Sequence, residues 1–170
     1  TLSATTAAVT AAGAGNATVL FADPSNYLSA SGLKSLAGLG AATVVVRPSF
    51  TALEALAPTV SAAGEAKKSS DLQARCEVDA AVRAGRVMAP GQAYRVTDAG
   101  SGSSANGTVG CFPSGNGGYA YVHIESGQGG PSVDVLGSTA VLSNDGIDRA
   151  GNAALALNVL GGTRTLVWYL

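Results

Sequence analysis

The fold class of this chain is limited most strongly by two apolar runs, each of which ends at a proline. The segments ATVLFADP (17–24) and ATVVVRPS (42–49) are almost continuously apolar, which is typical of parallel strands buried on both faces. Between them, residues 25–40 carry leucines near helical spacing, and a second short helix is expected at 51–58. This β-α-β-α order predicts a parallel sheet with helices on its faces.

The middle of the chain has a different pattern. A charged segment, 71–87, is expected to be helical. Three short strands are expected at 91–98, 108–113 and 119–126, separated by loops rich in Gly, Ser and Asn. We expect these strands to form an antiparallel meander within residues 88–126.

The C-terminal part returns to the α/β pattern. A strand and a polar turn are expected within 132–144, and Asn144 or Asp145 is expected to cap a helix that runs to about Leu160. Two glycines stop that helix, and 163–170 supplies the last strand.

The chain of 170 residues is expected to form a single α/β domain over 1–170, with 1–16 as a short helix or a frayed arm. The predicted architecture is a mostly parallel sheet flanked by helices, flavodoxin-like or amidotransferase-like, with the antiparallel meander in its middle. The last helix is apolar nearly all round, so we expect it to be buried and expect Leu157→Asp to unfold the domain.

Charge and hydropathy argue against a nucleic-acid partner and against a membrane-spanning segment within this sequence. The net charge is −1 and no stretch is dense in Lys or Arg, so nucleic acid is not an expected partner. No run reaches the roughly 18 apolar residues of a membrane span. The chain begins with Thr and has no basic stretch before an apolar one, so we expect a soluble piece of a longer protein rather than a signal peptide.

The chain has two cysteines, Cys76 and Cys111, both in polar, turn-rich surroundings. We favour a disulfide, which would indicate an oxidising compartment; the alternative is two buried free thiols in a cytosolic protein. One histidine and no C-x-x-C motif provide too few ligands for a metal site, and no cofactor is expected.

Topology selects one candidate ligand site. Ligands of parallel α/β sheets gather at the carboxyl ends of the strands. Asp23 and Arg47 end the first two strands, and Ser143, Asn144 and Asp145 precede the expected last helix, whose N-terminus suits a small anion. The simpler interpretation, which we favour, is that Asp23 and Asn144 are turn and cap residues and Arg47 is a surface charge.

No arrangement of catalytic residues is evident. The glycines of GAGNAT (13–18) precede a strand instead of following one, so they do not form a nucleotide loop, and neither cysteine lies in a nucleophile elbow. Alternation along the third meander strand places Tyr119, Tyr121, His123 and Glu125 on one face. That face is either a binding surface or, as we favour, the solvent-facing side of the strand.

The last 39 residues resemble a known family. The segments that carry the resemblance are LG (136–137), LSN (142–144), GNAALALN (151–158) and LVWYL (166–170). They are similar to the "GS/LSN" turn, "GNAALALNLLG" helix and closing "LVWYLP" of the bacterial membrane-protein family known as domain of unknown function 4350. A weaker similarity extends over residues 17–60 and around the cysteines.

The resemblance implies an extracytoplasmic domain held between membrane helices, on the outer face of the bacterial cell membrane. Relatives often accompany MoxR-type ATPases and von Willebrand-like membrane proteins, which implies a protein partner in the cell envelope. The fold is distantly similar to class I glutamine amidotransferase-like domains, but no position here matches their catalytic residues. We therefore expect a non-enzymatic sensor, scaffold or interaction domain. The alternative is an amidotransferase-like domain acting on a small anionic or sugar-like ligand at the strand carboxyl edge.

Overall fold

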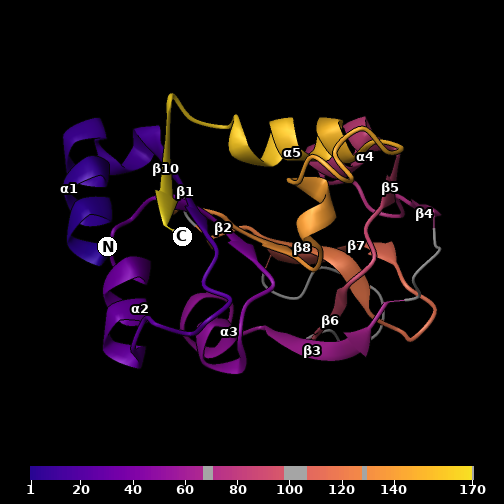
Figure 1. Cartoon of the computed structure of the whole chain (residues 1–170), viewed down its shortest axis with the longest axis horizontal. Coiled ribbons are helices and arrows are strands. Elements are labelled where there is room, and N and C mark those ends of the chain that lie inside the picture. The colour runs from indigo at the N-terminus through magenta and orange to yellow at the C-terminus, as the bar shows by residue number, and fades with distance from the viewer. Residues whose placement is uncertain (67–70, 98–106, 128–129, 170) are drawn as a thin grey trace.

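The computed structural model describes residues 1–66, 71–97, 107–127 and 130–169 (Figure 1). Ten strands and five α-helices occur in this part of the chain. The helices are α1 (Leu2–Ala12), α2 (Ala30–Ala37), α3 (Phe50–Leu56), α4 (Asp79–Ala84) and α5 (Asn152–Leu160). The strands are β1 (Ala17–Phe21), β2 (Ala42–Val46), β3 (Val60–Glu65), β4 (Asp71–Gln73), β5 (Arg86–Met88), β6 (Gln92–Val96), β7 (Thr108–Pro113), β8 (Tyr119–Ile124), β9 (Val133–Leu136) and β10 (Thr165–Tyr169).

The central sheet is mixed. Its strand order is β10-β1-β2-β9-β8-β6-β3, and β7 pairs with β8 outside this path. The strands β10, β1, β2 and β9 run parallel, whereas β8, β6, β7 and β3 pair antiparallel with their neighbours. The predicted α/β class and the parallel pairing of the first two strands are confirmed, and the expected helix or arm at the N-terminus is α1.

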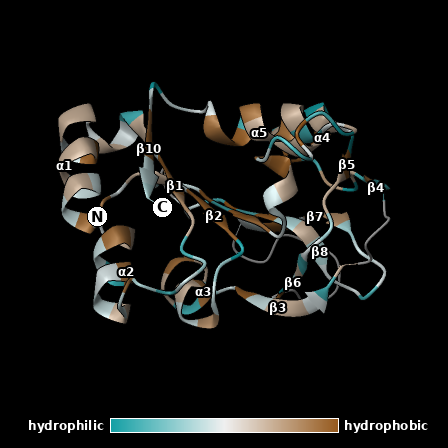
Figure 2. Ribbon diagram, viewed as in Figure 1, coloured by the Kyte–Doolittle hydropathy of each residue, from teal (hydrophilic) through white to brown (hydrophobic). Residues whose placement is uncertain are grey.

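Helices cover both faces of the parallel strands (Figure 1). Alternate side chains of β1 and β2 point to opposite faces: Val19 and Val45 pack with α1, α2 and α3, whereas Leu20 and Val44 pack with α4 and α5. Burial on both faces explains why these strands are almost continuously apolar. Figure 2 shows the same strands as apolar at the centre of the molecule. Within residues 1–66, 71–97, 107–127 and 130–169, none of the helices combines the length and the hydropathy that a membrane span needs.

The middle of the chain differs from the predicted meander. β7 and β8 form an antiparallel pair, but β6 pairs with β8 at Tyr94 and Tyr119 instead of pairing with β7. The backbone of Gln92 donates to the Gly137 carbonyl (2.8 Å), so β6 continues the line of β9 along the edge of β8. A Cβ atom at Gly137 would lie 1.8 Å from the Gln92 carbonyl oxygen, so only glycine allows this approach. Part of the predicted loop before β7 lies outside the described residues.

The segment 71–87 is not a single helix. It contains β4, the short helix α4 and β5, and β4 pairs antiparallel with β5. Gly85, with φ of 65°, ends α4 and returns the chain to β5. The strand β3 is absent from the sequence-based expectation, because its sequence VSAAGE has one β-branched residue, no aromatic residue and mostly small residues that are depleted in strands.

The last helix is shorter than predicted. Neither Asn144 nor Asp145 caps it, because residues 143–149 form turns and α5 begins at Asn152. The Asn152 side chain is fully buried and bonds both backbone groups of Met88 and the Gly146 carbonyl at 2.8–3.0 Å. These bonds fix where the helix starts against β5.

The expectation that α5 is buried all round is wrong. Leu155 is 1% exposed, but Leu157 on the same helix is 73% exposed. One face of the helix packs on the sheet and the other faces solvent. The reason for expecting Leu157→Asp to unfold the domain, which was burial of Leu157, therefore does not hold.

We expect Leu157→Asp to fold and to lower the free energy of unfolding by less than about 1 kcal/mol, because exposed positions tolerate charge. Leu155→Asp, two residues earlier, is expected to abolish folding because it buries an unpaired carboxylate. Urea unfolding followed by circular dichroism measures both. Equal destabilisation by the two substitutions would contradict the orientation of α5.

Candidate functional site

The five residues predicted at the strand carboxyl ends do not line one common cavity. The Asp23 carboxylate accepts hydrogen bonds from the backbone amides of Tyr27 (3.0 Å) and Leu28 (2.8 Å), so it organises its own loop. Arg47 is exposed, and Asn144 and Asp145 are exposed in turns and not at a helix start. No helix begins at residues 143–145, so the expected anion site at a helix N-terminus is not formed there. The turn role of Asp23 and the surface position of Arg47 agree with the interpretation that we favoured, whereas Asn144, expected as a cap, caps no helix.

The cavity at this edge is an apolar groove of about 530 Å³ between α5 and the strands β1, β2 and β10. Leucines of α5 line it together with Leu20, Val46 and Trp168. Of the five predicted residues, Ser143 alone belongs to it. The carboxyl edge thus offers apolar surface where the sequence suggested polar ligands.

A larger cavity lies toward the opposite edge of the sheet, and we call it the polar cleft. It measures about 1290 Å³ and is defined by side chains at the amino ends of the parallel strands, by the C-terminal end of α5 and by β7 and β8. Thr18 and Ala42 mark the starts of β1 and β2, and Ser132 immediately precedes β9. The residues Tyr119, Tyr121, His123 and Glu125 all line this cleft. They do not all share one face, because Tyr119 packs with Tyr94 and Val122 on the opposite side of the sheet from Tyr121.

The disulfide holds one wall of the polar cleft in place. Cys76, in the segment before α4, is bonded to Cys111 of β7, with 5.4 Å between their Cα atoms. Cys111 is fully buried, whereas Cys76 lines the cleft. The predicted disulfide is therefore present, and it fixes the segment 75–80 over the sheet.

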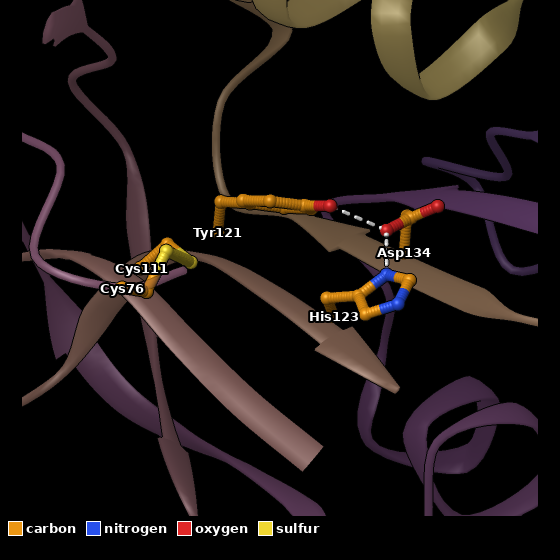
Figure 3. Close-up of polar contacts among 5 residues, drawn as sticks. All are labelled: Cys76, Cys111, Tyr121, His123 and Asp134. Carbon is orange, nitrogen blue, oxygen red and sulfur yellow. Dashed lines mark hydrogen bonds and ion pairs between the residues drawn. A yellow bond between two sulfur atoms is a disulfide. The ribbon is translucent and has the colours of Figure 1, made fainter. Parts of the chain in front are cut away.

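Three side chains form a hydrogen-bonded network on the floor of the cleft (Figure 3). The Tyr121 hydroxyl donates to Asp134 Oδ1 at 2.6 Å, and His123 Nδ1 lies 2.7 Å from the same oxygen. The register of β8 and β9 produces this contact, because His123 is directly opposite Asp134. Tyr121 is 1% exposed and Asp134 is 7% exposed, so the network is built into the sheet.

The carboxylate controls the protonation of both partners. Its hydrogen bond is the main cause that raises the pKa of His123, against a smaller opposing effect of burial. Burial, with the Asp134 charge, raises the pKa of Tyr121 far above its ordinary value, so the phenol keeps its proton. A carboxylate at Nδ1 favours the tautomer with hydrogen on Nδ1, which leaves Nε2 as the acceptor when the ring is neutral.

The arrangement suits recognition of a polar ligand. His123 and Asp134 together resemble the base and orienting acid of a hydrolase, but such an enzyme also needs a nucleophile beside the base. Of the cleft hydroxyls, Thr18 is paired with Thr163 at 2.8 Å and Thr108 with Thr59 at 3.0 Å. Ser132 also lines the cleft, but it makes no hydrogen bond to His123, whose bonded partner is Asp134. In the described part of the chain, no group of three His, Cys, Asp or Glu side chains is placed to hold a metal ion.

Sequence reasoning found His123 and Tyr121 but missed Asp134. The available signal was a single acidic residue inside the apolar run SVDVL, since a buried carboxylate in a central strand needs partners. Its partners come from a strand that is 11 residues away in sequence for His123 and 13 for Tyr121, and only the sheet register identifies them.

The raised pKa of His123 makes stability depend on pH. The protonated ring is favoured in the folded state, so its contribution is fully present below the ordinary pKa of 6.5 and is lost as the pH rises through the higher folded-state value. The His123→Gln variant can still donate an amide hydrogen to Asp134 but does not titrate. We therefore expect its free energy of unfolding not to show the fall with rising pH that His123 causes in the wild type. Urea unfolding of both proteins between about pH 5 and 9 tests it. Parallel pH profiles would contradict the assignment.

Comparison with known proteins adds two findings. Over 40 residues, the chain is 48% identical to the uncharacterized membrane protein Rv3691 of Mycobacterium tuberculosis. That stretch covers 24% of this chain and 10% of the relative, so the chain matches only a small part of that protein. The model of a family described as a domain of unknown function, DUF4350, matches residues 1–160. This match covers every described helix and strand except β10, and most of the polar cleft. The chain therefore belongs to the DUF4350 family.

Proposed function

We propose that this chain is a recognition domain of a bacterial membrane protein and that it binds its ligand in the polar cleft. The observation that carries the proposal is the buried Tyr121–Asp134–His123 network on the floor of an open cleft of about 1290 Å³. Ligand sites are concave and place a few oriented polar groups among packed side chains. The network meets that description, since both strands that hold it are central in the sheet.

We further propose that the domain lies on the extracytoplasmic side of the membrane. The Cys76–Cys111 disulfide supports an oxidising compartment, and the similarity to a protein described as a membrane protein supports a membrane context. A protein partner in the cell envelope, including one linked to MoxR-type ATPases, remains a proposal from the family resemblance.

Binding is favoured over catalysis at this site. The alternative, an amidotransferase-like domain, would use a cysteine nucleophile or a pocket that joins Asp23, Arg47 and Asn144. Both cysteines are bonded to each other, and none of those three residues lines the apolar groove or the polar cleft. We also propose that the fold is of the flavodoxin-like or amidotransferase-like type, which the parallel order of β10, β1, β2 and β9 supports.

Site-directed photo-crosslinking in cells tests the proposed function. A photoreactive amino acid replaces the exposed Glu125 at the cleft in the full membrane protein, and the matched control places it at the exposed Lys34 of α2 on the other side of the sheet. We expect a discrete adduct from position 125 and none from position 34. The absence of an adduct at 125, or equal adducts at both positions, would overturn the assignment of the cleft as the recognition site.

A further inference from the structure

One end of the central sheet is a strand whose outer backbone groups are unpaired. β10 is the outermost strand there (Figure 1), and within the described residues it pairs with β1 alone. The Ala22 amide donates to the Tyr169 carbonyl at 2.9 Å, so the backbone groups of Tyr169 point toward β1. Because these directions alternate along a strand, the amides and carbonyls of Leu166 and Trp168 point away from β1. In the described part of the chain, those groups have no hydrogen-bond partner.

The sequence of β10 has none of the features that protect a sheet edge. Proteins blunt such edges with proline, charged residues or bulges, because a free edge pairs readily with another chain. In this sheet, β3 has a register shift between Ala62 and Glu65, and β7 ends at Pro113. β10 has the sequence TLVWY, with neither charge nor proline, and its register with β1 is regular. This edge is therefore open to a further strand.

The side chains of β10 expose apolar surface on one face. Val167 and Tyr169 are buried in the cluster that contains Val9 of α1. Leu166 and Trp168 point to the opposite face, where they line the apolar groove and are 37% and 60% exposed. Tryptophan is enriched in protein interfaces, and its burial often contributes much of the binding energy. The strand thus combines free backbone groups with exposed side chains of the kind that interfaces bury.

We propose that two copies of this chain associate by antiparallel pairing of β10 with β10, around a two-fold axis at Val167. In this register Leu166 of each copy lies opposite Trp168 of the other, and each such pair exchanges two backbone hydrogen bonds. Every outward amide and carbonyl of Leu166 and Trp168 is then paired. No other two-fold register within Thr165–Tyr169 pairs both residues, so the strand complements itself in one way.

The side chains agree with this register. Leu166 and Trp168 lie on the same face of β10, so the two-fold axis places the leucine of one copy beside the tryptophan of the other. Aromatic and aliphatic side chains directly opposite each other stabilise an antiparallel pair. A contact of this kind is isologous, since the same surface of both copies forms it, and it closes as a dimer. The inference adds an assembly to the proposed recognition function and does not depend on it.

Sedimentation velocity of the chain over a range of concentrations tests the assembly. We expect a reversible monomer–dimer equilibrium. Trp168→Lys is expected to raise the dissociation constant at least about tenfold, because it removes the largest exposed side chain of the strand and puts a charge at its edge. Phe50→Lys is the matched control: Phe50 is 74% exposed on α3, which follows β2. This substitution should leave dimerisation unchanged.

Hydrogen exchange followed by NMR tests the pairing itself. The Val167 and Tyr169 amides face β1 and should be protected in monomer and dimer alike. The Leu166 and Trp168 amides should exchange fast in dilute protein and become protected as the dimer forms. Because Trp168 is the one tryptophan of the chain, its fluorescence should shift to shorter wavelength over the same concentrations.

Two results would overturn the inference. The first is a protein that stays monomeric at the millimolar concentrations of an NMR sample, with both outward amides still exchanging fast. The second is a dimer that uses another surface. Equal weakening by Trp168→Lys and Phe50→Lys would reveal such a dimer, and so would association that leaves the Leu166 and Trp168 amides unprotected.

Discussion

The structure depends on the position of β9, which hydrogen-bonds a parallel strand on one edge and an antiparallel strand on the other. Its pairing with β2 completes the parallel half of the sheet, and its pairing with β8 begins the antiparallel half. Val135 packs toward α3 while Asp134 and Leu136 face the side of α4 and α5. A one-residue slip of β9 would move Asp134 to the opposite face and separate it from His123.

The pairing of β9 with β2 and β8 also places the site at the amino ends of the parallel strands and not at their carboxyl ends. The carboxyl edge is occupied by the apolar side chains of α5 and β10. At the amino edge, the small Ala42 and the polar Thr18 leave the sheet open beneath the end of α5. The disulfide adds a wall that the sheet alone does not supply. A rigid floor with oriented polar groups is what recognition requires.

The sequence predicted the elements whose signals are local. Continuous apolar runs identified β1 and β2, and alternation placed Tyr121 and His123 together. The sequence could not predict pairings between distant segments. These include the contact of β6 with Gly137 and the hydrogen bonds that Tyr121 and His123 make with Asp134. It also gave no local signal for β3, whose residues are mostly small. The start of α5 was misplaced because Asn152 is fixed by Met88, 64 residues away in sequence. The exposure of Leu157 likewise depends on how far α5 turns over the sheet, which composition does not encode.

Because His123 is the one histidine of the chain, its protonation state can be observed without assignment. A long-range ¹H–¹⁵N spectrum of the histidine-labelled protein, recorded above the folded-state pKa of His123, tests whether Asp134 holds the ring in the cleft. The structure predicts a single tautomer with hydrogen on Nδ1, which Asp134→Asn converts to the mixture of an unrestrained ring. A wild-type spectrum with hydrogen on Nε2, or with both tautomers in exchange, would contradict the network on which the proposed site rests.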